Sequence, residues 1–226
     1  MRVLCLAAHP DDEVLGAGGT LLRHAARGDE TFLVVATVAY APRWSETAVR
    51  QKRDECLAAA ALLNVRDVRF LEFPTMHLNA LPAIDLNDAV GRALSDFKPN
   101  VIYVPPCDDL NRDHALLFED ALVASRPGGL GSLHTVYSYE IPTTTRCNIA
   151  TRWHPNSYVD IGPFIEPKLA AMSAYRSELR DPPHPRSLDA IRAFARERGA
   201  AVGLGYAEAH MLVREVRCDA DFRRPQ

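Results

Sequence analysis

The sequence VLCLAAHPDDE, residues 3–13, joins a short apolar run to a cluster of one imidazole and three carboxylates. Continuous apolar residues over Val3–Ala8 are typical of a strand that is covered on both faces of its sheet. The polar cluster, Ala8–Glu13, therefore falls where that strand ends. Histidine and carboxylate side chains crowded at the end of a strand indicate a metal and acid/base site. The rest of the chain should then supply one more ligand.

Alternating apolar runs and helical patterns follow this first strand. We expect further strands at Thr31–Val38, Val68–Phe73 and Val101–Val104. Helical patterns cover Val14–Arg27, Glu46–Leu63, Leu86–Phe97 and Asp113–Ala124. This alternation predicts an α/β fold with a Rossmann-like, mostly parallel sheet and helices on both of its faces.

The C-terminal part of the chain is less regular. Strands are predicted at Val136–Ile141 and Tyr158–Ile161, and helices at Glu166–Arg176 and Leu188–Arg198. We find no internal repeat, low-complexity tract or linker in the 226 residues. The chain is therefore predicted to form a single domain over residues 1–226.

Charge and cysteine usage exclude several classes of protein. The formal net charge of −3 gives no electrostatic reason to expect nucleic acid or an anionic membrane as a partner. No run approaches the ~20 apolar residues of a membrane span. The five cysteines, at Cys5, Cys56, Cys107, Cys147 and Cys218, form no CxxC pair. Reduced thiols and a cytoplasmic protein are the expectation, and a homo-oligomer is compatible with it.

A metal site is predicted where two strands end. In open α/β sheets, ligands bind beyond the carboxyl ends of the strands, so the loop at His9 and the loop over residues 107–114 should meet. His9, Asp12 and His114 would provide a His₂Asp set, which suits a catalytic zinc with one position left for water. Other divalent transition metals, such as iron or cobalt, fit the same ligands.

Two further carboxylates have expected roles at this site. A metal lowers the pKa of bound water toward roughly 7, and Asp11 is the candidate base for its proton. Asp113 is the candidate carboxylate that orients a ligand histidine, because it is adjacent to one. The alternative for the acidic cluster is a favourable helix start. That alternative does not explain His9 or the second Asp–His pair.

Several motifs together resemble one known family. They are AHPDDE at Ala8–Glu13, RDECLAAAALLNV at Arg53–Val65, DLNRDH at Asp109–His114, HPNSYVDI at His154–Ile161, and the later PHPRS and YAEAH. In these motifs the chain resembles the PIG-L/LmbE zinc deacetylases. The resemblance implies removal of an acetyl group from an N-acetylglucosamine conjugate.

The resemblance also implies roles for particular residues. It places zinc ligands at His9, Asp12 and His114, with Asp11 as general base. Many members have a histidine three residues before the second metal histidine, where this chain has Asn111. An amide can donate a hydrogen bond to an oxyanion but cannot act as a general acid near pH 7. Asp11 would then serve both proton-transfer steps.

The remaining candidates concern substrate binding and packing. Arg43 and Asn156 are candidate substrate-binding residues, with a solvated arginine and a turn-forming asparagine as the alternatives. The glycines of Gly16–Gly19 lack the spacing of a nucleotide loop, and close helix–sheet packing is the favoured interpretation. Trp44 and Trp153 could form a wall on which a sugar stacks, but filling of the core is the favoured interpretation.

The predicted function is that of a zinc-dependent hydrolase acting on an N-acetylated amino sugar or its conjugate, a small-molecule substrate. One alternative is a zinc amidase that acts on another acylated amine or a thiol conjugate. A second alternative is a metal- or sugar-binding module without turnover. The presence of Asp11 beside a full ligand set argues against the second alternative, because a pure binder needs no base.

Overall fold

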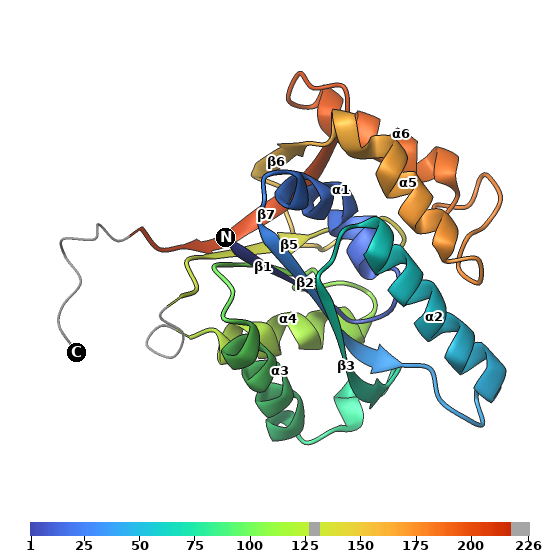
Figure 1. The fold of residues 1–226 in the computed structure, drawn as a ribbon, viewed down its shortest axis with the longest axis vertical. Helices are drawn as coiled ribbons and strands as arrows, with labels where there is room; N and C mark the ends of the chain where they lie inside the picture. The colour runs from blue at the N-terminus through green and yellow to red at the C-terminus, as the bar shows by residue number, and fades with distance from the viewer. Residues whose placement is uncertain (127–131, 218–226) are drawn as a thin grey trace.

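The computed structural model describes residues 1–126 and 132–217, which form one twisted sheet between two layers of helices (Figure 1). The strands are β1 Arg2–Ala7, β2 Glu30–Val38, β3 Asp67–Pro74, β4 Val101–Val104, β5 Thr135–Tyr139, β6 Ser157–Asp160 and β7 Ala207–Glu215. The α-helices are α1 Asp12–Ala26, α2 Glu46–Leu62, α3 Ala83–Phe97, α4 Arg112–Ala124, α5 Ile165–Ala174 and α6 Leu188–Ala200. Short 3₁₀ turns lie at Leu78–Ala80, Thr145–Cys147 and Gly162–Phe164.

The strand order across the sheet is β3-β2-β1-β4-β5-β7-β6. Strands β1 to β5 pair in parallel, whereas β7 is antiparallel to both of its neighbours, β5 and β6. The prediction of a mostly parallel α/β sheet is confirmed. The strand β7 is absent from the sequence prediction, and it joins the irregular C-terminal part to the main sheet.

Both faces of the central strand β1 are buried. Val3, Cys5 and Ala7 belong to one apolar core, which α1, α2, α5 and α6 cover. The alternate residues, Leu4 and Leu6, belong to the other core, under α3 and α4. This arrangement explains why the opening strand is apolar at every position from Val3 onward rather than at every second one.

Helix α1 carries glycines where it packs against two large side chains. A Cβ atom built on Gly16 would lie 2.1 Å from the Tyr139 ring, and one on Gly19 would lie 2.7 Å from Ile161. These contacts agree with the packing interpretation of Gly16–Gly19. The close approach fixes the N-terminal end of α1, and with it the acidic cluster.

The chain crosses from one half of the sheet to the other between β1 and β4. From β1 it runs outward through β2 to the edge strand β3, and α3 then returns it to β4 on the other side of β1. Such a switch point leaves a crevice at the carboxyl ends of the two central strands. The loops that follow β1 and β4 carry the predicted site.

Two other expectations can be compared with the structure. The cysteines among the described residues are all free, and Cys218 lies outside the described residues. None of the helices in residues 1–126 and 132–217 is long and apolar enough to cross a membrane.

Candidate active site

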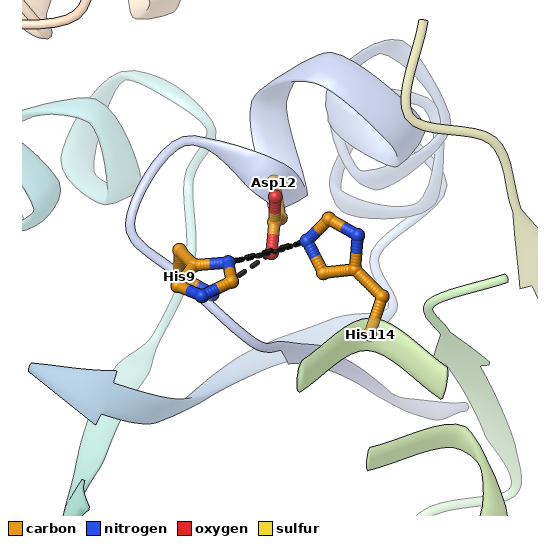
Figure 2. Close-up of side chains that lie close together, drawn as sticks. All are labelled: His9, Asp12 and His114. Carbon is orange, nitrogen blue, oxygen red and sulfur yellow. Dashed lines mark hydrogen bonds and ion pairs between the residues drawn. The ribbon is translucent and has the colours of Figure 1, made fainter. Parts of the chain in front are cut away.

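Three side chains from two distant segments converge at the switch point (Figure 2). His9 and Asp12 lie in the turn from β1 into α1, and His114 lies in the first turn of α4. His114 Nε2 is 3.2 Å from both His9 Nδ1 and Asp12 Oδ2, and His9 Nδ1 is 3.5 Å from Asp12 Oδ2. The structure therefore brings the three predicted metal ligands together, with one ligand atom of each facing the other two.

A carboxylate lies next to the outer nitrogen of each imidazole and so determines that the inner nitrogen can bind a metal. The outer nitrogen of His9, Nε2, lies 3.0 Å from Asp113 Oδ2, and the outer nitrogen of His114, Nδ1, lies 3.1 Å from Asp109 Oδ1. A proton on each outer nitrogen leaves a lone pair on each inner one, as in most metal-binding histidines. Asp113 thus orients His9 rather than the adjacent His114. Asp109, which the sequence analysis did not select, occupies the corresponding position behind His114.

This donor set fits a divalent transition metal. Two inner lone pairs and a carboxylate oxygen pointing at one another repel unless a cation or a proton lies among them. Burial alone would lower the pKa of His114, yet the carboxylates of Asp12 and Asp109 raise it to about 10. The cluster therefore requires positive charge. Ligands at ~2.0–2.1 Å from a tetrahedral zinc are roughly 3.3 Å apart, close to the separations found here.

Asp11 lines the cavity that also holds His9, Asp12 and His114. It is the N-cap residue of α1, is 2% exposed and has a left-handed backbone with φ 103°. Among the described residues, its Oδ2 atom accepts no hydrogen bond, and Arg186 Nε is 3.5 Å away. Burial raises the pKa of Asp11 to about 6, while Arg186 acts in the opposite direction. A carboxylate of that pKa suits a general base near neutral pH.

Glu13 supports the turn from beneath and does not reach the cavity. Its carboxylate accepts hydrogen bonds from Tyr175 Oη at 2.6 Å and from the backbone N–H of Asp11 at 3.2 Å. Burial raises the pKa of Glu13 to about 8, against the effect of the Tyr175 hydrogen bond. The left-handed backbone of Asp11 is held in place through this contact.

The cavity above these residues has a volume of about 190 Å³. Its wall includes Trp44 and Asn111, together with the charged side chains of Lys52, Glu178 and Arg186. The prediction that both tryptophans fill the core is therefore right for Trp153, which is 3% exposed, and wrong for Trp44. Trp44 lies in the loop before α2, where its ring packs against Tyr40 rather than beneath the helices.

Asn111 has two contacts that fix its orientation. It caps α4, and its side-chain oxygen accepts a hydrogen bond from the backbone N–H of Asp113 at 3.1 Å. Its own backbone N–H donates to Asp109 Oδ1. Among the residues that the structure describes, no acceptor contacts the side-chain nitrogen of Asn111, which can therefore donate a hydrogen bond at the cavity wall, where an oxyanion donor was expected.

The two predicted substrate-binding residues lie outside the cavity wall. Arg43 is exposed, and its guanidinium carbon lies 5.1 Å from the centroid of the Trp44 ring. Trp44 lines the cavity, so Arg43 contacts a wall residue rather than the cavity itself. Asn156 accepts a hydrogen bond from the backbone N–H of Leu212 at 2.7 Å, at the start of the β6–β7 pairing. Its contacts agree with the alternative of a structural asparagine.

Lys52, Glu178 and Arg186 are cavity residues that the sequence analysis did not assign. Glu178 forms ion pairs with both Lys52 and Arg186, which links helix α2 to the proline-rich turn before α6. The sequence feature that could have identified Arg186 is the PHPRS motif, which contains it. The network holds the guanidinium of Arg186 beside Asp11.

The sequence is similar to those of two bacterial deacetylases. A 1D-myo-inositol 2-acetamido-2-deoxy-alpha-D-glucopyranoside deacetylase of Mycobacteroides abscessus is 30% identical over 45% of this chain and 46% of its own length, just under half of that relative. Deacetylase 1 of the same name from Saccharopolyspora erythraea is 24% identical over 79% of this chain and 78% of its own. These relatives are hydrolases of an amide bond.

Solved structures share the whole fold. N,N'-diacetylchitobiose deacetylase from Pyrococcus horikoshii superposes with a TM-score of 0.78 at 23% identity, over 94% of this chain and 84% of that one. GalB, a 4-carboxy-2-hydroxymuconate hydratase from Pseudomonas putida KT2440, gives 0.76 at 20% identity, over 96% and 98%. The fold therefore carries more than one chemistry. Residues 4–125, which contain every residue of the His₂Asp cluster, match the family described as PIG-L, GlcNAc-PI de-N-acetylase, and the chain belongs to that family.

Proposed function

We propose that this protein is a zinc-dependent hydrolase that removes the acetyl group from an N-acetylated amino sugar or its conjugate. The observation that carries the proposal is the position of Asp11. Asp11 lines the same cavity as His9, Asp12 and His114, and among the described residues its buried Oδ2 atom accepts no hydrogen bond. Metal ligands beside a free base form the arrangement that hydrolysis of an amide by water needs.

The metal would be held by His9 Nδ1, Asp12 Oδ2 and His114 Nε2. Bound there, a divalent cation supplies Lewis-acid chemistry, which acidifies water and polarises a carbonyl group. Asp113 and Asp109 keep the protons of the two imidazoles on their outer nitrogens. Both ligand lone pairs then remain directed into the site.

Asp11 transfers the proton from the attacking water to the departing amine. As a carboxylate, its Oδ2 atom takes a proton from the attacking water, and as an acid it returns that proton to the departing amine nitrogen. Arg186, 3.5 Å from that oxygen, favours the carboxylate form between turnovers. Because the site has no second acid at Asn111, one group performs both transfers.

Asn111 would stabilise the negative oxygen that forms when water adds to the amide carbonyl. Its side-chain oxygen is held by the Asp113 backbone, so its NH₂ group is the part available to the cavity. A preorganised donor of this kind stabilises charge without reorganisation at the moment of reaction. The capping contact is what preorganises it.

The amino-sugar substrate is supported by the family and by the named activities of the relatives, two of which act on a 2-acetamido-2-deoxy-glucopyranoside. The polar wall of Lys52, Glu178 and Arg186 beside the single indole of Trp44 also suits a sugar, which presents hydroxyl groups at its edges and C–H groups on its faces.

Release of free amine from a panel of acylated compounds tests the proposal. The panel contains N-acetylglucosamine glycosides, an N-acetylated amino acid and an acylated thiol conjugate, each assayed with metal-free and zinc-loaded protein. We expect zinc-dependent acetate release that is fastest for the glycosides. Release from the other compounds alone would indicate the amidase alternative, and release from none would indicate a binding module.

A further inference from the structure

A second hollow adjoins the catalytic cavity at the N-terminal end of α4. It has a volume of about 410 Å³ and shares Met76, Asn111 and Thr144 with the catalytic cavity. The catalytic cavity, at about 190 Å³, is smaller than the roughly 300 Å³ at which small-molecule sites begin. The two hollows together fall within that range, so one ligand of ordinary size would occupy both.

Two of the residues that line this hollow are apolar and exposed. Met76 is 60% exposed and Leu110 is 58% exposed, and both line the hollow. Single exposed apolar residues are common on protein surfaces. A pair from two separate loops that line one hollow is more specific, because that hollow adjoins the catalytic cavity.

The backbone of Met76 is held in an unfavourable conformation. Its φ angle is 63°, in the left-handed region that a methionine rarely adopts. Asp113 Oδ2 accepts a hydrogen bond from the Met76 N–H at 2.6 Å, and the same oxygen contacts His9. The carboxylate that orients a metal ligand therefore also fixes the exposed methionine at the edge of both hollows.

One charge in this hollow is available to a ligand. Arg112 lines it, is exposed and has no carboxylate within ion-pair distance among the described residues. The charge of Asp113, by contrast, is used by His9 and by the backbone N–H groups of Met76 and Leu78. An anionic group would meet a free guanidinium here, and a cationic group would be repelled.

We infer that this second hollow binds the aglycone of the substrate, and that the preferred aglycone combines an apolar group with a negative charge. The inference rests on the proposed function. The relatives are deacetylases, so the acyl part is small and the variable part lies on the amine side. Leu110 and Met76 would contact the apolar group, and Arg112 would pair with the anion.

Three glycosides of N-acetylglucosamine test the inference, with methyl, phenyl and 4-carboxyphenyl aglycones. We expect kcat/KM to rise in that order. Leu110→Ala should lower the phenyl-to-methyl ratio about fivefold, through KM, since it removes three carbons that a bound ring covers on one side. Arg112→Gln should lower the carboxyphenyl-to-phenyl ratio about threefold, as an exposed ion pair is worth less than 1 kcal/mol. Ile84→Ala, in α3 and 62% exposed, is the matched control.

A binding measurement separates this inference from the proposed function. The probe is the deacetylated product, 4-carboxyphenyl 2-amino-2-deoxyglucoside, titrated calorimetrically into each zinc-loaded protein. Weaker binding to Leu110→Ala and Arg112→Gln than to Ile84→Ala supports the subsite even if no glycoside is turned over. Unchanged binding and unchanged ratios in both variants overturn it.

Discussion

Replacing Asp113 by asparagine should weaken zinc binding much more than the same change at Asp109. Each residue is the carboxylate behind one ligand imidazole, so each substitution removes one negative charge next to the metal site. Loss of such an outer partner typically costs 10- to 100-fold in metal affinity. The two sites differ in what their second carboxylate oxygen contacts, and that difference predicts which end of the range each variant reaches.

At Asp109 the second oxygen contacts only hydroxyl groups. Thr144 and Thr145 donate to Oδ2 at 2.9 and 2.7 Å, and a hydroxyl can turn round and accept from an amide NH₂. Asparagine there keeps its oxygen toward His114 without a conflict. We therefore expect the loss to come from charge alone, about 10-fold.

At Asp113 both oxygens contact groups that can only donate. Oδ2 accepts from the backbone N–H of Met76, and Oδ1 accepts from that of Leu78 at 3.4 Å. An amide NH₂ must then face a backbone N–H in either orientation, which leaves a buried donor unpaired at a cost of roughly 1–3 kcal/mol. A cost of about 1.4 kcal/mol lowers zinc affinity by a further factor of ten. Together with the roughly 10-fold loss from the missing charge, the expected loss of zinc affinity in Asp113→Asn is about 100-fold.

Competition with a chromophoric chelator at pH 7.5 measures zinc affinity in both variants and in the unmodified protein. Circular dichroism and urea unfolding of the metal-free proteins check that each variant is folded. Equal losses in the two variants, or a larger loss in Asp109→Asn, would contradict the asymmetry. Wild-type affinity in folded Asp113→Asn would remove the orienting role altogether.

Three further predictions follow from other contacts. Asp11→Asn should keep its zinc yet lose at least about 10²-fold in kcat, whereas His114→Ala should lose zinc; full turnover in zinc-loaded Asp11→Asn would exclude the base. Gly16→Ala should destabilise the fold by about 2 kcal/mol in urea unfolding because its Cβ meets the Tyr139 ring, whereas Ala at the uncrowded Gly91 should stabilise it slightly. Burial lowers the pKa of His210 from 6.5 to about 4, so the unfolded chain takes up a proton first as the pH falls. Protonation of His210 should therefore lower the free energy of unfolding by about 2 kcal/mol between pH 7.5 and pH 5. The free energy of unfolding of His210→Gln should fall by about 2 kcal/mol less over the same pH range.

Much of the fold could be predicted because the strands of the first half are buried on both faces. Their runs are continuously apolar, so they stand out from the helices between them. Strand β7 could not be recognised in this way, because it carries Glu208 and His210 at buried positions. Both groups find their partners only in the folded state, where Lys168 forms an ion pair with Glu208 at 2.5 Å and the Thr20 hydroxyl forms a hydrogen bond with His210 at 2.9 Å.

The ligand set could be predicted because each ligand follows a central strand. The carboxylates behind the two imidazoles could not be predicted in the same way, since residues adjacent in sequence are not always adjacent in space. Asp113 and His114 are consecutive on a helix, where successive side chains point about 100° apart. Asp113 therefore reaches His9 from across the crevice, and Asp109, in the loop before the helix, reaches His114. Arg186 lies in an aperiodic turn 175 residues from Asp11, and no local pattern connects the two.

Stepwise zinc loading tests the central claim most directly. Metal-free protein is titrated with zinc, and bound zinc per chain and amine release from an N-acetylglucosamine glycoside are measured on the same samples. A single His₂Asp site predicts activity that rises in proportion to occupancy and reaches its plateau at about one zinc per chain. Activity in the metal-free protein, or no activity with one zinc bound at His9, Asp12 and His114, would contradict the claim.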